Sequence, residues 1–181
     1  MFPVRKILPE MIEMETAIFA AGCFWGVEES FRTKKGVIDT VVGYTGGHVD
    51  LSRLKDPYKL VCTDKTGHAE AVQVTFDPKQ VSYEELVDFF FHIHDPTQLN
   101  RQGPDVGSQY RSVIFFRDRK QHDIAHAVKE RWETSGKIPG RIVTEIAPVS
   151  TFYPAEEYHQ KYFKKNGSHG CLTYIDWETK Q

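Results

Sequence analysis

Cysteine is scarce in this chain, long hydrophobic runs are missing, and neither sign of charge dominates. Three cysteines occur among 181 residues, at Cys23, Cys62 and Cys171, and so odd and sparse a set points to packing, metal binding or catalysis rather than a disulfide scaffold. No apolar run approaches the ~20 residues needed to cross a bilayer, and glutamates interrupt residues 1–15 before a signal-peptide core develops. The net charge is −2 and the Lys and Arg residues are scattered along the chain, so the sequence shows no basic cluster of the kind that binds nucleic acid. We therefore expect a cytoplasmic protein that binds neither membranes nor nucleic acid.

The composition predicts one domain with a sizeable core. Hydrophobic residues make up 40% of the chain and charged residues 27%, which is typical of a globular domain of this length. We expect an N-terminal arm at residues 1–15, a single domain at 16–167 and a C-terminal tail at 168–181.

Hydrophobic periodicity predicts an alternation of strands and helices. The helix after Ser82 is the best marked, because Ser82 and Glu85 form a capping box and Val81 with Leu86 a hydrophobic staple. Two long polar loops, 45–68 and 96–109, are of a length that is usually functional or disordered. The alternation fits an α+β, two-layer sandwich. The predicted strands are 16–20, 37–44, 69–76, 112–116 and 142–148, and the predicted helices are 24–34, 83–93, 119–134 and 154–166.

Cys23 lies where a strand turns into a helix. Gly22 turns the chain, and the unpaired amides and positive end of the helix would stabilise a thiolate at Cys23. Phe24 and Trp25 beside it could wall an apolar pocket. The alternative, a buried structural cysteine in an aromatic core, is left open by these residues alone.

Glu70 is the first residue on the apolar face of the predicted strand at 69–76. By the alternation of strand side chains it shares the face of Val72, Val74 and Phe76. Burial there would raise its pKa and keep it protonated as a proton donor. The alternative is a carboxylate at the strand end that is turned to solvent.

The loop 101–111 and two histidines complete the candidate groups. Asp105 and Tyr110 are polar groups that this glycine-rich loop could present to a ligand, unless it is an ordinary surface loop. His122 and His126 stand four apart on one helix face, a spacing used in metal sites. No third ligand is evident near them, so we predict no metal cofactor.

Four strings carry a specific resemblance. GCFWG at 22–26, GYTGG at 43–47, GHAE at 67–70 and GSQYRS at 107–112 stand in this chain in the order found in peptide methionine sulfoxide reductases of the A type. Each string alone is weak, whereas four in order are specific. The chain resembles that family from about residue 16 to residue 171.

The resemblance implies a ferredoxin-like α+β sandwich with a mixed sheet and long functional loops. It also implies an enzyme that reduces methionine-S-sulfoxide, free or in proteins, and so repairs oxidative damage. Cys23 would be the nucleophile and Glu70 the acid, while Phe24 and Trp25 would hold the substrate methyl group. The remaining implied catalytic residues are Tyr58, Asp105, Tyr110 and, in the tail, Cys171.

The chemistry makes sense of this set. A sulfoxide oxygen leaves poorly until it is protonated, so an acid must lie near the thiol. Attack by Cys23 would leave a sulfenic acid, which Cys171 would condense to a disulfide that thioredoxin or dithiothreitol reduces. No bound cofactor is implied, and we expect a monomer. Whether Cys62 joins the disulfide relay stays open, as does the preference for free or protein-bound sulfoxide.

Two other classes of function compete with this prediction. A cysteine hydrolase or acyltransferase needs a histidine base, and His68 is the one histidine in the motifs. A non-catalytic module that binds peptides in an aromatic pocket would leave Cys23 with ordinary reactivity.

Overall fold

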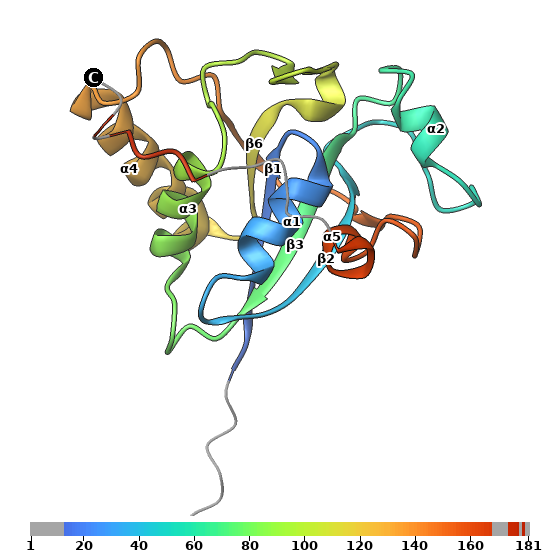
Figure 1. Cartoon of the computed structure of the whole chain (residues 1–181), viewed down its shortest axis with the longest axis horizontal. Helices are drawn as coiled ribbons and strands as arrows, with labels where there is room; N and C mark the ends of the chain where they lie inside the picture. The colour runs from blue at the N-terminus through green and yellow to red at the C-terminus, as the bar shows by residue number, and fades with distance from the viewer. Residues whose placement is uncertain (1–12, 168–173, 178, 180–181) are drawn as a thin grey trace, which may run out of the picture.

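The computed structural model describes residues 13–167, 174–177 and 179. Most of the predicted N-terminal arm and Cys171 in the tail lie outside these residues. Figure 1 shows a central sheet with helices packed against it.

A six-stranded sheet in the order β7-β6-β1-β3-β2-β8 forms the centre of the molecule. Its strands are β1 (Glu15–Ala21), β2 (Val37–Thr45), β3 (Ala69–Phe76), β6 (Ser112–Phe116), β7 (Glu145–Pro148) and β8 (Tyr153–Pro154). The helices are α1 (Phe24–Arg32), α2 (Tyr58–Val61), α3 (Tyr83–His92), α4 (Arg119–Ser135) and α5 (Tyr162–Asn166). A two-stranded hairpin of β4 (Arg101–Gln102) and β5 (Asp105–Val106) precedes a 3-10 turn, η1 (Ser108–Tyr110).

The sheet is mixed, because β7 runs parallel to β6 whereas the other pairings are antiparallel. The prediction of an α+β fold with a mixed sheet is confirmed. The ferredoxin-like core stays a prediction, which the order β6-β1-β3-β2 of the four central strands supports.

The two faces of the sheet bury different partners. Alternate residues of β1, such as Ala17 and Phe19, pack into a cluster with apolar residues of α1, α3 and α4. Ile18 and Ala20, on the opposite face, pack instead against the segment that includes Val149 and Phe152. The helices therefore cover one face, and α1 packs on β2 and β3 (Figure 1).

The two helices whose capping residues are recognisable in the sequence, α3 and α4, form as predicted. The Ser82 side chain accepts a hydrogen bond from the Glu85 amide and the Glu85 carboxylate accepts one from the Ser82 amide, which is the predicted capping box. Asp118 caps α4, and Gly136 ends it with a positive φ of 66°. These elements form as predicted because their caps are local in sequence.

The predicted helix at 154–166 is wrong. Pro154 belongs to β8, turns follow it, and only Tyr162–Asn166 is helical. The Gln160 side chain accepts from the Val42 amide at 2.9 Å and donates to the Val42 carbonyl at 2.9 Å. Lys161 adopts a positive φ of 52°, which a helix interior does not allow. Side-chain bonds to the sheet therefore replace the helical ladder in this segment.

Two other differences are smaller. The predicted strand at 142–148 begins only at Glu145. The predicted loops at 45–68 and 96–109 contain the short elements α2 and β4–β5.

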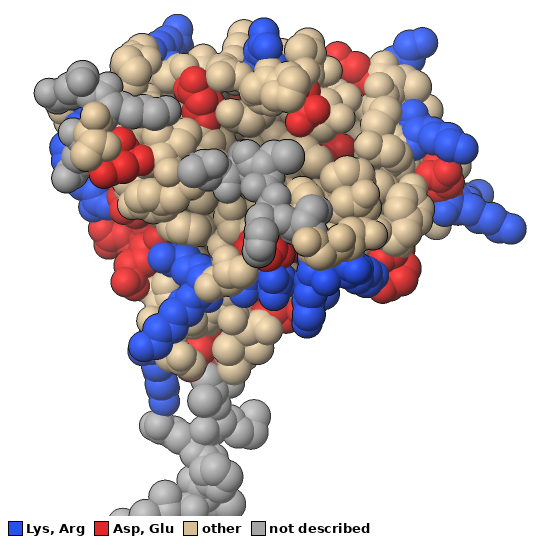
Figure 2. Space-filling view, viewed as in Figure 1, with Lys and Arg blue, Asp and Glu red and all other residues tan. Residues whose placement is uncertain are grey.

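The surface agrees with the scattered charges of the sequence. On the face shown in Figure 2, Lys and Arg side chains lie next to Asp and Glu around the rim. Among the described residues, no helix is both long and apolar enough to cross a membrane.

Candidate active site

Cys23 is the N-cap residue of α1, at the junction with β1. Gly22 makes the turn with a φ of +96°, and an added Cβ there would lie 2.7 Å from Cβ of Gln102. Gln102 is itself fixed, because its side chain accepts from the Asp95 amide at 3.1 Å and donates to the Asp95 carbonyl at 3.0 Å. Only glycine fits this turn. The absence of a side chain at Gly22 lets Gln102 of the β4–β5 hairpin pack next to Cys23.

The prediction that the helix end stabilises a Cys23 thiolate is wrong for the site as it stands. The pKa of the thiol is raised to about 12, by burial first and then by the nearby carboxyls of Glu70 and Asp105. The amides of Trp25 and Gly26 do act in the predicted direction and lower the pKa. Desolvation outweighs them because the Cys23 side chain is only partly exposed, in a cavity that Trp25, Gln102 and Phe163 also line.

Glu70 lies directly behind the helix mouth. Its side chain is 2% exposed, and Oε2 accepts a hydrogen bond of 3.0 Å from the amide of Phe24, the residue after the nucleophile candidate. Burial raises the pKa of Glu70 to about 8, against the opposing effect of that amide, and the Asp105 carboxyl adds to the rise. The expected burial is confirmed, and the pKa shifts in the expected direction; the role of Glu70 as proton donor stays a prediction.

The other motifs pack against Glu70 through the sheet. Tyr44 of the GYTGG string pairs with Glu70 across β2 and β3, and Gly47 lies so close to His68 that a Cβ would meet its amide at 2.4 Å. The Gly47 amide donates to Nδ1 of His68 at 3.1 Å, and Nε2 lies 2.7 Å from the Val49 carbonyl. Both nitrogens of His68 are engaged by backbone, so it is not a base for Cys23. The histidine that the motifs offered to a cysteine hydrolase is therefore not available as its base.

The two predicted tyrosines come from loops that meet beside Glu70. The Glu70 carboxyl raises the pKa of Tyr58 and of Tyr110, for which burial is the largest cause. Asp64, after α2, accepts a 2.9 Å bond from the Ser108 amide. That bond ties the loop carrying Tyr58 to the turn carrying Tyr110.

Asp105 and Cys62 also lie within reach of this group. Asp105 raises the pKa of Cys23, Glu70 and Tyr110. The Cys62 thiol is exposed and hydrogen-bonds the Tyr58 hydroxyl. The structure thus gathers five of the predicted catalytic residues: Cys23, Tyr58, Glu70, Asp105 and Tyr110.

A cavity of about 370 Å³ opens in front of Cys23. Trp25 and Phe163 supply its aromatic walls, and Asp105 and Gln102 supply polar groups. Phe24 is 1% exposed and packs against the ring of Tyr44 at 5.8 Å instead of lining the cavity. Of the two aromatics predicted to hold substrate, Trp25 is the one that the cavity exposes.

Glu156, His159 and Tyr162 belong to the site, although no pattern in the sequence singles them out. Glu156 accepts from the Tyr44 hydroxyl at 2.9 Å and from the Tyr58 amide at 3.0 Å. His159 accepts from the Trp25 indole at 3.0 Å, and the Tyr162 ring stacks on Trp25 at 3.8 Å. A helix expected at 154–166 does not reveal their role, because their hydrogen bonds reach residues 98 to 134 positions away.

Cys171 lies outside the described residues, but the chain on either side of it is anchored. Phe163 of α5 lines the cavity. Ile175 exchanges hydrogen bonds with His92, its amide donating to the carbonyl at 2.6 Å. Trp177 donates to the Phe91 carbonyl at 2.7 Å.

A half-buried thiol at a helix mouth, with a buried carboxyl of raised pKa beside it, is the arrangement of a thiol-dependent enzyme. Among the described residues, no group of three or more His, Cys, Asp or Glu side chains is placed to hold a metal. The family model for peptide methionine sulfoxide reductase matches residues 15–181. The chain belongs to this family, and the relatives below place it in the A type.

Two archaeal relatives and a yeast protein illustrate the match. The peptide methionine sulfoxide reductase MsrA of Methanosarcina acetivorans is 60% identical over 154 residues, which are 85% of this chain and 80% of that one. The MsrA of Methanothermobacter thermautotrophicus is 56% identical over 157 residues, 87% and 90% of the two chains. Reduced Mxr1 from Saccharomyces cerevisiae has a TM-score of 0.84 at 37% identity, over 95% of this chain and 98% of that one. The family prediction and the prediction of thiol-dependent methionine sulfoxide reduction are therefore confirmed.

Proposed function

We propose that Cys23 attacks the sulfur of methionine-S-sulfoxide and becomes a sulfenic acid as methionine leaves. The sulfoxide oxygen passes to the cysteine sulfur, so the thiol is oxidised by two electrons and the sulfoxide is reduced by two. Trp25 packs against the substrate methyl group, and Phe24 supports it from behind. The cavity in front of Cys23, with its aromatic walls, supports this assignment.

Glu70 donates the proton that the sulfoxide oxygen requires. Its hydrogen bond to the Phe24 amide, 3.0 Å long, and its pKa of about 8 carry the proposal. Near neutral pH, Glu70 and Cys23 both hold their protons, so both are available as the oxygen is transferred. Tyr58 and Tyr110 hydrogen-bond that oxygen as charge builds on it, and Asp105 holds the loop side of the pocket.

Cys171 condenses with the sulfenic acid, which forms a Cys23–Cys171 disulfide and releases water. Cys171 follows Gly167 by four positions and precedes Ile175 by four. On the N-terminal side, Gly167 donates its amide to the carbonyl of Phe163, and Phe163 lines the cavity in front of Cys23, which supports a short reach to Cys23.

An external dithiol then reduces the disulfide, and thioredoxin is the reductant we propose. A structure of yeast Mxr1 in complex with Trx2 has a TM-score of 0.62 at 28% identity, over 95% of this chain and 97% of that one. Dithiothreitol should replace thioredoxin in vitro. We further propose a cytoplasmic monomer that acts on free and protein-bound sulfoxide and needs no bound cofactor.

The test is dithiothreitol-driven reduction of each epimer of a methionine sulfoxide peptide. We expect the wild-type chain to reduce the S epimer and Cys23→Ser to reduce neither. Cys62→Ser is the matched control, because it also removes a thiol but keeps Cys23, and it should remain active. Equal activity of Cys23→Ser and the wild-type chain would refute the proposal.

A further inference from the structure

We propose that His159 is a positioning residue: it holds the Trp25 indole in place as the wall against the substrate methyl group, and so sets the preference for S-methyl over larger S-alkyl sulfoxides. This inference rests on the function proposed above, in which Trp25 packs against that methyl group. His159 and Trp25 are 134 positions apart in sequence and form a side-chain hydrogen bond of 3.0 Å.

The hydrogen bond fixes the protonation state of His159. The Trp25 Nε1–H donates, so Nδ1 of His159 accepts and carries no proton. A neutral imidazole then has its hydrogen on Nε2. His159 is 1% exposed, and burial lowers its pKa, which favours the neutral ring that the bond needs.

The Nε2 side of the ring faces Glu156. Among the described residues, no acceptor lies within hydrogen-bonding distance of Nε2, but Oε2 of Glu156 lies 3.9 Å away. At that distance the attraction is electrostatic and not a hydrogen bond. It favours the tautomer with the hydrogen on Nε2, and so leaves Nδ1 free to accept from Trp25.

One short segment thereby contacts two residues of the proposed site, Tyr58 and Trp25. Glu156 accepts from the amide of Tyr58, and His159, three residues later, accepts from Trp25. The His159 ring also packs between the rings of Phe24 at 5.1 Å and Tyr58 at 4.5 Å. Movement of this segment would displace Tyr58 and Trp25 together.

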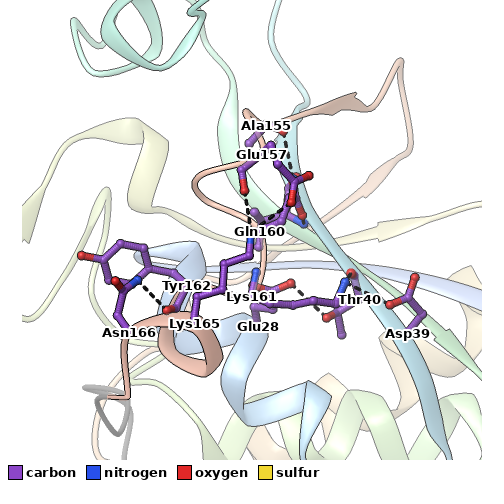
Figure 3. A network of polar contacts seen from close by, with 11 residues as sticks. Glu28, Asp39, Thr40, Ala155, Glu157, Gln160, Lys161, Tyr162, Lys165 and Asn166 are labelled. Carbon is purple, nitrogen blue, oxygen red and sulfur yellow. Dashed lines mark hydrogen bonds and ion pairs between the residues drawn. The ribbon is translucent and has the colours of Figure 1, made fainter.

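The polar network in Figure 3 fixes the segment to the rest of the fold. The Lys161 amide donates to Glu28 of α1 at 2.7 Å, and the Lys161 ammonium donates to the Thr40 carbonyl at 2.9 Å and pairs with Asp39 at 3.1 Å. Glu28 is 1% exposed and also accepts from the Thr40 hydroxyl at 3.0 Å. His159 is therefore held by contacts that do not depend on Trp25.

Trp25 is held on two sides. The Tyr162 ring stacks on the indole at 3.8 Å with the planes 6° apart, which prevents the indole from tilting. Stacking leaves sliding and rotation within the plane nearly free, and the hydrogen bond to His159 stops these motions. Without that bond the wall of the methyl pocket becomes movable, although its apolar surface stays the same.

The discriminating measurement compares kcat/KM for methionine sulfoxide and ethionine sulfoxide peptides, which differ by one methylene at the S-alkyl group. We expect His159→Gln to lower the ratio of kcat/KM for the methionine sulfoxide peptide to that for the ethionine sulfoxide peptide by about five-fold. This is the size expected for one net hydrogen bond, and most of the change should lie in the KM values. Glutamine places its polar atoms at the position of Nε2, whereas asparagine keeps an acceptor at the position of Nδ1. His159→Asn should therefore keep the ratio within about two-fold of wild type.

A double-mutant cycle with Trp25→Phe tests whether His159 acts through the indole. In the Trp25→Phe background, which lacks the N–H donor, His159→Gln should leave the ratio unchanged. The indole N–H signal gives a readout that needs no turnover: three tryptophans are present, Trp25→Phe assigns its signal, and His159→Gln should speed its hydrogen exchange.

An unchanged substrate ratio together with an unchanged Trp25 exchange rate in His159→Gln would overturn the proposal. So would the same loss in His159→Asn as in His159→Gln. Failure of the wild-type chain to reduce either sulfoxide would refute the proposed function instead, and the exchange rate would still decide whether His159 holds Trp25.

Discussion

Replacing Glu70 by glutamine should change how stability depends on pH. Glu70 is 2% exposed, and its pKa is about 8 in the fold against 4.5 for the free side chain. Each pH unit corresponds to ~1.4 kcal/mol, so ionising Glu70 in the folded chain costs ~5 kcal/mol more than ionising it in the unfolded chain.

The sign follows from proton uptake. Between pH 4.5 and about 8 the folded state keeps the Glu70 proton and the unfolded state has lost it, so this residue makes the fold less stable as pH rises. The penalty is absent below pH 4.5 and complete above about pH 8. Glutamine stays neutral, and its side-chain oxygen can still accept from the Phe24 amide.

We therefore expect Glu70→Gln and the wild-type chain to be similarly stable near pH 5. At pH 9 we expect the variant to be more stable by several kcal/mol, up to ~5. The assay is urea unfolding at pH 5 to 9 with a reductant present. Groups that titrate identically in both chains cancel in the difference between their free energies of unfolding. Glu130→Gln, on the exposed surface of α4, is the control. A difference that stays constant across this range would refute the assigned pKa and its cause.

Three further predictions follow from the same residues. The single-turnover rate of sulfoxide reduction should fall as pH rises through about 8, since Glu70 loses its proton there. Glu70→Gln should be slow at every pH and lack that pH dependence. A wild-type rate that is flat from pH 6 to 9 would contradict this. Gly22→Ala should cost ~1–3 kcal/mol of stability and at least ten-fold in kcat/KM, because its Cβ would meet Gln102 at 2.7 Å. Gly136→Ala, also at positive φ but with nothing within 4 Å, should lose stability alone, and equal activities of the two would contradict the steric account. Cys171→Ser should release one methionine per chain and then stall with thioredoxin, and multiple turnovers in a quenched-flow experiment would remove Cys171 as resolver.

The parts of the site that the sequence predicts are those decided by local chemistry. The burial of Glu70 follows from the side-chain alternation of β3, and the position of Cys23 follows from a glycine turn between a strand and a helix. The capping box of α3 is likewise complete within four residues. In each case the residues that decide the structure are neighbours along the chain.

The parts that the sequence does not predict depend on contacts between distant segments. The helix expected from Pro154 is replaced by turns because Gln160 bonds to Val42, 118 positions away. No local pattern reports that bond. The same applies to the Asp64–Ser108 contact, which joins the two tyrosine-bearing loops, and to the pairing of His159 with Trp25.

The error about the Cys23 thiolate has the same origin and bears on the mechanism. The helix end does lower the pKa of the thiol through two amides, but burial, followed by the carboxyls of Glu70 and Asp105, outweighs them and the pKa is raised to about 12. A low-pKa thiol would be a constant nucleophile, open to oxidation by small molecules. In the proposed reaction, the thiol and the Glu70 carboxyl instead share one desolvated site in which both stay neutral. A thiolate alone is unfavourable in this desolvated pocket. When a sulfoxide is bound, its oxygen takes up a proton as Cys23 attacks, and this proton transfer offsets the charge that develops on the oxygen. The burial that suppresses the thiolate is thus the same burial that keeps Glu70 able to donate.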